Sequence, residues 1–357
     1  MLPEKHRLKN GEHLHVHTLD PPLPESYRSL IWWRFVQDEL LKGAWSDTLY
    51  TVYFVGRINE EITGSLAYYA PADTRDIGVV EFVSTEDEHR RKGVASVLMG
   101  CMIDHFTQHG GQVLYLCTNN PSAGALYEKH GFWYHVGDGM RYLAPDAEDF
   151  DRRYFAGGEP ARVRAATWGD LPRMAALYNH PEPDWLIKNY LTQSFNDTRV
   201  EVHFLQLMKR LEGGNGLFYV LETADRRAVG AVAIERLSTY YEQHVAYITF
   251  RIAPAYLSQA EDLISAVETE ARKIGIEILH IQIAGRDIDQ IELIKSLSFE
   301  ETARFKRHFK DGDSPYDLLV FGKELCGGGG AKRGKKDYYG GREPWQADRI
   351  SDNQSEK

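Results

Sequence analysis

Hydrophobic and polar residues in the first part of the chain follow the two periods that distinguish strands from helices. Residues 13–18 alternate and predict a half-buried strand, and residues 49–55 and 61–69 predict an antiparallel pair joined by a turn at 56–59. Apolar positions from Gly93 to residue 109 recur at helical spacing and predict a helix. The other expected elements are a helix at 27–41 and strands at 78–83, 113–118, 134–136 and 140–143. Together they predict a mixed sheet with helices on both faces.

The same order of elements begins again at Val163, where a strand and a capped helix start are expected. The elements that follow are a hairpin at 218–222 and 228–236, strands at 246–252, 276–283 and 318–321, and helices at 258–274 and 290–297. A period of ~150 residues is too long for a solenoid and indicates tandem duplication. We therefore predict an α/β (α+β) fold with two tandem domains, each a mixed, mostly antiparallel twisted sheet flanked by helices.

Composition predicts where the domains end. Residues 144–160 are acidic and irregular, then rich in Gly and Pro. We place the first domain at 1–150, a linker at 151–160 and the second domain at 161–326. Residues 327–357 begin with a basic, glycine-rich run and cannot bury enough apolar surface to offset their ordering entropy. We expect this tail to be disordered.

The net charge of −10 limits the classes of partner. An acidic protein is a poor match for nucleic acid, because binding to phosphates requires a basic surface. The same charge suits a cationic substrate such as an amine, but it also simply keeps a protein soluble. The three cysteines have no disulfide or zinc spacing, and no signal peptide or membrane span is evident. We expect a cytoplasmic protein with no membrane partner.

The stretch from Val79 to Ala95 predicts a buried strand, an acidic turn and the start of a helix. The first N–H groups of a helix have no internal partner and carry the positive end of its dipole. Gly93 and the small Ala95 allow a phosphate to approach these groups, and Arg91 and Lys92 add positive charge beside them. The alternative is a basic surface turn that happens to cap a helix.

A second block downstream favours the phosphate-binding alternative. It follows the apolar strand at 113–118 and consists of Asn120, Ala123, Leu126 and Tyr127, then Lys129-x-Gly131-Phe132. With Arg90-x-x-Gly93-x-Ala95 before it, this block resembles the motifs of the GNAT family of N-acetyltransferases, over residues 13–143. The departures are small: Ala95 stands where Gly or Ala is accepted, and Asp87 where proline is frequent.

The resemblance implies an acetyl-CoA-dependent N-acyltransferase that transfers the acetyl group directly within a ternary complex. The pyrophosphate would bind the N–H groups from Arg91 to Ala95, the pantetheine would lie along Phe82 and Val83, and Asn120 would contact the cofactor. The expected acetyl-CoA contacts are therefore Phe82, Val83, Arg90, Arg91, Lys92, Gly93, Val94, Ala95 and Asn120.

Two catalytic residues are expected. A lysine-like ammonium must lose a proton before it reacts, which at pH 7 costs roughly 4.6 kcal/mol. Glu81 is the one carboxylate within the apolar strand and is the candidate base, unless it points to solvent. The resemblance implies that Tyr127 protonates the departing thiolate. Direct transfer needs no nucleophile, so we interpret Cys117, at the end of a strand, as a core residue.

For the remaining candidate side chains we weigh a structural role against a functional one. His13, His15 and His17 share one face of a strand, which indicates a polar outer face rather than a metal site, and we expect no metal. Trp32 and Trp33 lie in the helix that the resemblance places along one wall of the acceptor cleft. They are candidates for substrate contact, although core packing is expected for at least one of them.

In the second domain the motif positions are replaced. Aligned strand to strand, Leu257, Ala260 and Asp262 stand at the places of the arginine, the glycine and the small residue of the first domain. Asp287 stands at the place of the asparagine and Ile294 at that of the tyrosine. We therefore expect a degenerate GNAT-like domain that binds no acetyl-CoA and braces the first, so that a monomer mimics a dimer.

The sequence leaves three functions open. The first is an N-acetyltransferase acting on an amine of a small molecule or a peptide. The second keeps the CoA site but uses another acyl-CoA or a non-amine acceptor. The third is a non-catalytic CoA-binding or scaffold protein, which the complete motifs of the first domain disfavour.

Overall fold

The fold was derived from a computed structural model that describes residues 3–188, 200–236 and 239–325. The tail expected to be disordered, 327–357, lies outside the described residues. Within these residues, no helix combines the length and the apolar character needed to cross a membrane.

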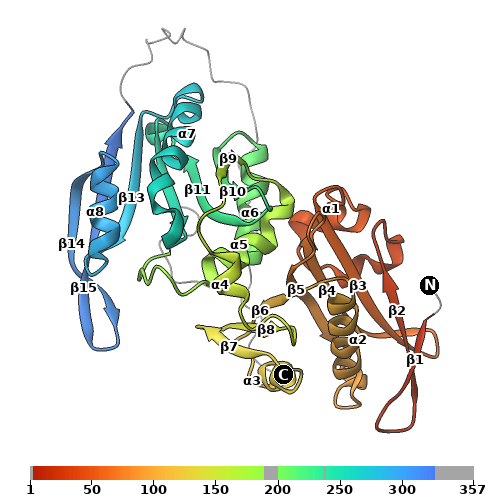
Figure 1. The fold of residues 1–357 in the computed structure, drawn as a ribbon. Helices are drawn as coiled ribbons and strands as arrows, with labels where there is room; N and C mark the ends of the chain where they lie inside the picture. Colours follow the sequence, from red (N-terminus) through yellow and green to blue (C-terminus); the bar gives the residue numbers. More distant parts are fainter. Residues whose placement is uncertain (1–2, 189–199, 237–238, 326–357) are drawn as a thin grey trace. The chain divides into compact units, whose positions relative to one another are not determined.

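The first sheet has eight strands in the order β1-β2-β3-β4-β5-β6-β8-β7 (Figure 1). Neighbouring strands are antiparallel, except for the parallel pair β5 and β6. The predicted mixed, mostly antiparallel sheet is therefore confirmed. The strands are β1 (Glu4–Arg7), β2 (His13–Leu19), β3 (Leu49–Ile58), β4 (Glu61–Pro71), β5 (Ile77–Thr85), β6 (Val113–Cys117), β7 (Trp133–Val136) and β8 (Gly139–Leu143).

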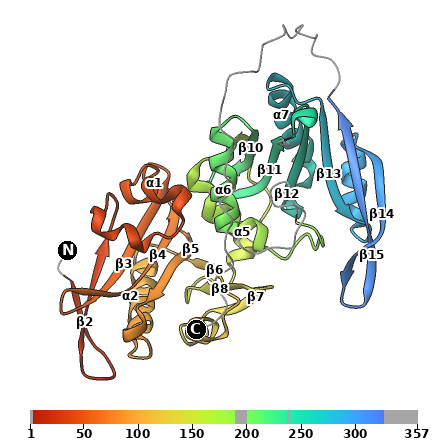
Figure 2. The same ribbon diagram turned by 180° about the vertical axis from the view of Figure 1, so that it is seen from behind.

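Helices cover both faces of the first sheet. Helix α2 (Val94–Gln108) lies across strands β2 to β5 on one face and buries Leu98, Met102 and Phe106 against them (Figure 1). Helix α3 (Pro121–Lys129) contributes Tyr127 to the same core. The view from behind shows α1 (Gln37–Lys42) and its neighbouring turns on the other face (Figure 2).

The second sheet has seven strands in the order β14-β15-β13-β12-β11-β10-β9. Read from β9, this order repeats that of the first sheet read from β2, and the parallel pair β12 and β13 stands at the place of β5 and β6. Only β1 has no counterpart among the described strands. The strands are β9 (Ala161–Ala165), β10 (Gly216–Thr223), β11 (Ala228–Arg236), β12 (Val245–Ile252), β13 (Ile278–Ala284), β14 (Glu300–Asp311) and β15 (Ser314–Glu324).

Helix α5 (Leu171–Asn179) contacts strands of both sheets, namely β4, β5 and β6 of the first and β11 and β12 of the second. All nine of its residues are buried. The ion pair of Arg173 with Asp73 adds a polar contact at the same place, with Nη2 and Oδ1 2.5 Å apart. The remaining helices of the second domain are α6 (Val200–Glu212), α7 (Ala260–Lys273) and α8 (Ile288–Ser296).

The helix expected at 27–41 is wrong as a single element. The chain forms two 3-10 helices, Glu25–Leu30 and Arg34–Val36, before α1. The side-chain amide of Gln37 donates to the carbonyl oxygens of Arg28 and Ile31, at 2.9 and 2.6 Å, and so takes acceptors that a continuous helix would use. Trp33 between the two 3-10 helices has a non-helical ψ of 80°.

Other boundaries differ for local reasons. The first hairpin turns at Asn59 and Glu60, which both have positive φ, so the predicted four-residue turn was too long. Helix α4 (Phe150–Tyr154) enters the segment that we expected to be a linker, and its two aromatic ends are buried. Strands β1 and β14 were missed because most of their residues are exposed and lack an apolar alternation.

Candidate functional site

A bulge in β5 marks the centre of the candidate site. Ser84 pairs with Ser65 and Glu81 with Ala67, so β5 has one residue more than β4 over this span. The bulge includes Phe82, which has φ 57, a left-handed value that is rare for a bulky residue. Bulges of this kind change the direction of side chains and backbone groups, and they are frequent beside active sites.

Strands β5 and β6 separate beside this bulge. Their last parallel pair joins Val79 to Tyr115, whereas β5 continues to Thr85. The described pairing thus ends two residues before Glu81. The backbone around Phe82 and Val83 therefore lies where an extended ligand can bind along β5 in place of a neighbouring strand.

Helix α2 begins beside the end of β5 without a side-chain cap. Its N-cap is Gly93, with φ 100, and a Cβ placed on this residue would meet nothing within 4 Å. Arg91 also has a left-handed φ, of 62. No described side chain caps the N–H groups of the first turn, which carry the positive end of the helix dipole, and this arrangement suits an anion.

Two of the expected cations of this loop have carboxylate partners. Nη2 of Arg90 is 2.8 Å from Oδ1 of Asp87, and Nζ of Lys92 is 3.3 Å from Oε2 of Glu12. These exposed pairs can be exchanged for an anionic ligand at small cost, since exposed ion pairs contribute ~0–1 kcal/mol.

The structure adds a cation that the sequence analysis did not include in the site. Nζ of Lys129, at the end of α3, lies 3.2 Å from Oγ of Ser96 in the first turn of α2. The same hydroxyl is 2.8 Å from Nε2 of His130. Lys129 belongs to the motif that we recognised, but only the packing of α3 against α2 places it there.

Asn120 caps α3. Its Oδ1 accepts hydrogen bonds from the N–H groups of Ser122 and Ala123, at 2.9 and 3.3 Å. A contact with acetyl-CoA, which remains a proposal, would therefore come from Nδ2. The residue thus has a structural reason to be asparagine, independent of any ligand.

Glu81 and Tyr127 are both buried, with exposed fractions of 8% and 6%. Burial, with the charge of Glu81 as the second cause, raises the pKa of Tyr127 to about 12. The alternative that Glu81 points to solvent is therefore wrong. The phenol keeps its proton at neutral pH, as a proton donor must.

The charge of Glu81 acts on two buried phenols, those of Tyr127 and Tyr53, and Phe82 follows Glu81 in the chain. Trp32 packs edge-on against Phe82, with ring centroids 5.0 Å apart, and 45% of Trp32 remains exposed. Tyr53 was missed by the sequence analysis. Its buried hydroxyl has no hydrogen-bond partner among the described residues, and burial followed by the charge of Glu81 raises its pKa. By contrast, Trp33 packs against the core of the domain, as expected for one of the two tryptophans.

The corresponding positions of the second domain do not repeat this site. The first turn of α7 carries Glu261 and Asp262, and its N-cap, Gln259, has φ −100. Asp287 is buried and accepts the N–H of Leu186 at 2.9 Å, and burial raises its pKa to about 6. Ile294 is fully buried in the core. Asp287 therefore serves local hydrogen bonding and Ile294 serves packing.

Three of the solved structures that match this chain each cover less than half of it. An N-acetyltransferase from Staphylococcus aureus Mu50 has 15% identity and a TM-score of 0.41, over 47% of this chain and 99% of the match. A ribosomal-protein-alanine N-acetyltransferase from Brucella melitensis has 23% identity and a TM-score of 0.39, over 46% and 99%. A GNAT superfamily phosphinothricin acetyltransferase from Sinorhizobium meliloti, in complex with AcCoA, has 14% identity and a TM-score of 0.40, over 46% and 88%.

Among curated proteins, no sequence matches this chain. Two family models match it in succession. The acetyltransferase (GNAT) family model matches residues 16–132, and the acetyltransferase (GNAT) domain model matches residues 163–320. The matched segments contain most strands of both sheets and all the motif positions considered above. The chain therefore belongs to the GNAT acetyltransferase family, as a member with two tandem GNAT domains.

Proposed function

We propose that the first GNAT domain transfers an acetyl group from acetyl-CoA to an amine, and that the second domain binds no acetyl-CoA. The observation that carries the proposal is the uncapped N-terminus of α2 beside the bulge in β5. A helix start without a side-chain cap suits a pyrophosphate, and a Cβ at Gly93 would meet no described atom within 4 Å.

The residues that would hold acetyl-CoA come from three elements. The N–H groups from Arg91 to Ala95, with the side chains of Arg90, Lys92 and Lys129, would bind the pyrophosphate. The backbone at Phe82 and Val83 would bind the pantetheine amides. Acetyl-CoA supplies the acetyl group as a reactive thioester.

Glu81 and Tyr127 would handle the two protons of the reaction. An amine enters as an ammonium at neutral pH, and Glu81 takes its proton directly or through one water molecule. The buried phenol of Tyr127 stays protonated because its pKa is raised to about 12, so its Oη can give a proton to the departing sulfur. Burial strengthens both roles, since charges interact more strongly away from water.

The acceptor is proposed only as a class, an amine of a small molecule or of a peptide. Glu81 supplies a negative charge, and Phe82, its neighbour in the chain, packs against the partly exposed ring of Trp32. A carboxylate beside aromatic rings attracts a cationic group. The acidic net charge of the chain acts in the same direction.

A matched pair of variants tests the donor site. Ala95 is half-buried in the first turn of α2, where a glutamate would favour the helix dipole but repel a pyrophosphate. We expect Ala95→Glu to lose acetyl-CoA binding by ~10-fold or more in calorimetry, since a 10-fold loss corresponds to only ~1.4 kcal/mol. The neutral control, Ala95→Gln, should retain most of the affinity.

The same calorimetric titration also gives the number of acetyl-CoA molecules bound per chain. Wild-type chain should bind one acetyl-CoA, because Glu261 and Asp262 occupy the first turn of the corresponding helix in the second domain. Two molecules bound per chain, or wild-type affinity in Ala95→Glu, would contradict the assignment.

An assay of CoA release over a panel of amines, with mass spectrometry of the products, tests the reaction. An acetylated amine supports the proposal. Acetyl-CoA binding without a product from any amine would favour the scaffold alternative, and products with other acyl-CoA donors would favour a different acyl group.

A further inference from the structure

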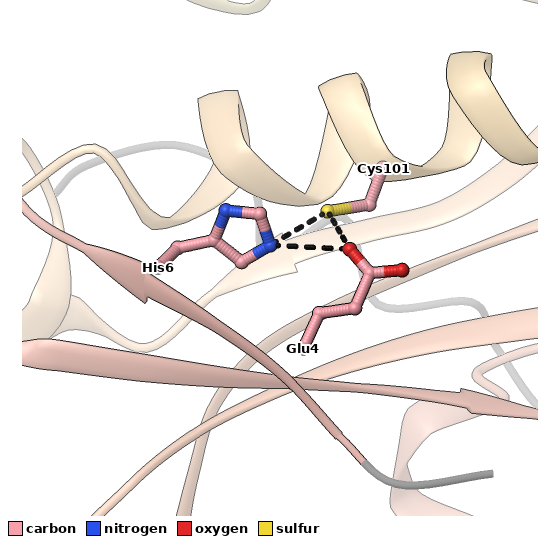
Figure 3. A group of neighbouring side chains, drawn as sticks. All are labelled: Glu4, His6 and Cys101. Atoms are coloured by element: carbon pink, nitrogen blue, oxygen red, sulfur yellow. Dashed lines mark hydrogen bonds and ion pairs between the residues drawn. The ribbon is translucent and has the colours of Figure 1, made fainter.

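Three side chains with metal-binding atoms meet in the first domain, and none of them is among the residues proposed to bind acetyl-CoA (Figure 3). They are Glu4 and His6 of β1 and Cys101 of α2. His6 Nε2 is 3.3 Å from Cys101 Sγ and 3.3 Å from Glu4 Oε2, and the sulfur and the carboxylate oxygen are 3.8 Å apart. Figure 3 shows all three atoms turned toward one point between the strand and the helix.

The pairing of β1 explains why these side chains converge. Glu4 and His6 are two residues apart on a strand, so they share one face. Their partners on β2 are Val16 and Leu14, which are buried in the core under α2. Residues directly opposite each other in a sheet point to the same side, so Glu4 and His6 also point toward α2. Cys101 is on the helix face that they meet.

The separations match those between ligands of one zinc ion. With Zn–N and Zn–O bonds of ~2.0–2.1 Å and a Zn–S bond of ~2.3 Å, the ligand atoms of a tetrahedral site are ~3.3–3.6 Å apart. The observed 3.3, 3.3 and 3.8 Å need adjustments of only a few tenths of an ångström. Thiolate, imidazole and carboxylate are also the three ligand types that Zn²⁺ uses in proteins.

We propose that Glu4, His6 and Cys101 bind one Zn²⁺ ion, with water as the fourth ligand. Glu4 and His6 remain partly exposed, with side-chain exposures of 63% and 34%, so an ion can enter from solvent and a water can complete its shell. Binding displaces the thiol proton of Cys101 to solvent and forms the zinc–sulfur bond. The metal would join the edge strand β1, the strand without a counterpart in the second domain, to α2.

The local charges favour a cation. Glu4 and Asp104 place negative charge beside Cys101, and negative charges attract a divalent ion. Without an ion the three side chains can hydrogen-bond to one another, so the experiment has to separate the two states.

The sequence analysis expected no metal, and nothing in the spacing suggested this group. Cys101 and His6 are 95 residues apart, and β1 is polar at most positions. The histidines that alternate on β2 are the other candidate group in this domain. Within the described residues they form no group of three ligand atoms, whereas Glu4, His6 and Cys101 do.

The test titrates the metal-free full chain with ZnCl₂ and with CoCl₂. We expect one Zn²⁺ per chain by calorimetry. The Co²⁺ form should show a thiolate-to-cobalt charge-transfer band and the strong visible bands of a tetrahedral site. Both Cys101→Ser and His6→Ala should lose stoichiometric binding. The controls are Cys117→Ser, which removes the other described thiol, and His13→Ala, which removes an exposed histidine of β2.

Circular dichroism and acetyl-CoA titration show whether each variant is folded. Acetyl-CoA affinity should be unchanged in Cys101→Ser and His6→Ala, which separates the failure of this proposal from a failure of the proposed enzyme function. His6→Ala, on an edge strand, keeps the test valid if the serine variant unfolds. The proposal is overturned if no Zn²⁺ binds stoichiometrically, if Co²⁺ shows no thiolate band, or if the two variants bind as the wild type does.

Discussion

Trp45 and Trp168 stack face to face, with ring centroids 3.7 Å apart and ring planes 12° apart, although they belong to different GNAT domains. The turn that carries Trp45 ends at Thr48, whose N–H donates to the carbonyl of Trp45 at 2.9 Å. The 3-10 helix that carries Trp168 begins with a capping box formed by Thr167 and Asp170. The two indole rings stack in van der Waals contact, so there is no room for an added atom between them.

Gly169 provides a test of this close approach. A Cβ at this position would lie 2.2 Å from the carbonyl oxygen of Thr48, which is backbone and cannot move alone. We expect Gly169→Ala to lower the free energy of unfolding by ~1–3 kcal/mol, the usual cost of overpacking. The control is Gly100→Ala in α2, where a Cβ meets nothing within 4 Å and higher helix propensity should add up to ~1 kcal/mol. Equal stability of the two variants in urea denaturation would contradict the packing argument.

Tyr127→Phe tests the proposed proton donor. We expect turnover to fall by ~100-fold or more, because a general acid typically contributes 10²–10⁴-fold. Acetyl-CoA affinity should hardly change, since the hydroxyl acts only as the sulfur departs. Tyr142→Phe is the matched control, because Tyr142 packs against the same Phe132 ring, at 5.5 Å, outside the proposed machinery. A Tyr127→Phe enzyme with wild-type turnover would show that another group, or water, supplies the proton.

Glu81→Gln tests the proposed base through its pH dependence. The free fraction of a lysine-like amine, with pKa ~10.4, grows about tenfold per pH unit below that value. The loss of rate should therefore be largest near pH 7 and should shrink as the pH rises. Glu86→Gln, an exposed acid just after β5, is the control and should follow the wild-type profile. A constant loss at every pH would indicate that Glu81 binds or positions the acceptor without removing a proton.

Lys188 makes stability depend on pH. Its Nζ donates to the carbonyl of Tyr178 at 2.9 Å, and burial, with Arg251 as the second cause, lowers its pKa from 10.5 to about 7. Between these two pH values the unfolded chain binds one more proton than the folded chain. This group therefore makes stability rise with pH in that window, by up to ~1.4 kcal/mol per unit.

Urea denaturation at several pH values between neutral and alkaline checks this dependence. Lys188→Met should reduce the slope, because the methionine cannot titrate. Lys42→Met should leave the slope unchanged, because the side chain of Lys42 is 70% exposed. The assignment fails if the two variants show the same slope.

The sequence predicted some elements of the fold correctly and others wrongly. The hairpin of β3 and β4, the strand β5 and the helix α2 were predicted because each repeats a local period over enough residues to be recognised. The single helix at 27–41 was wrong because Gln37 reaches back to two carbonyl groups, a side-chain contact that no period records. The residues proposed to bind acetyl-CoA were found through a motif, so they remain a proposal until the ligand is tested.

The sequence by itself determined most of the strands of both domains, the glycine at the start of α2 and the loss of that glycine in the second domain. These are properties of neighbouring residues, and local sterics and periodicity suffice to specify them. Only the tertiary structure decided that Lys129 reaches Ser96, that α5 is buried by both sheets and that Glu4 and His6 meet Cys101. Each of these contacts joins segments that are far apart in the chain. The geometry of these contacts depends on how strands pair and helices pack. The spacing of residues along the chain does not encode that geometry.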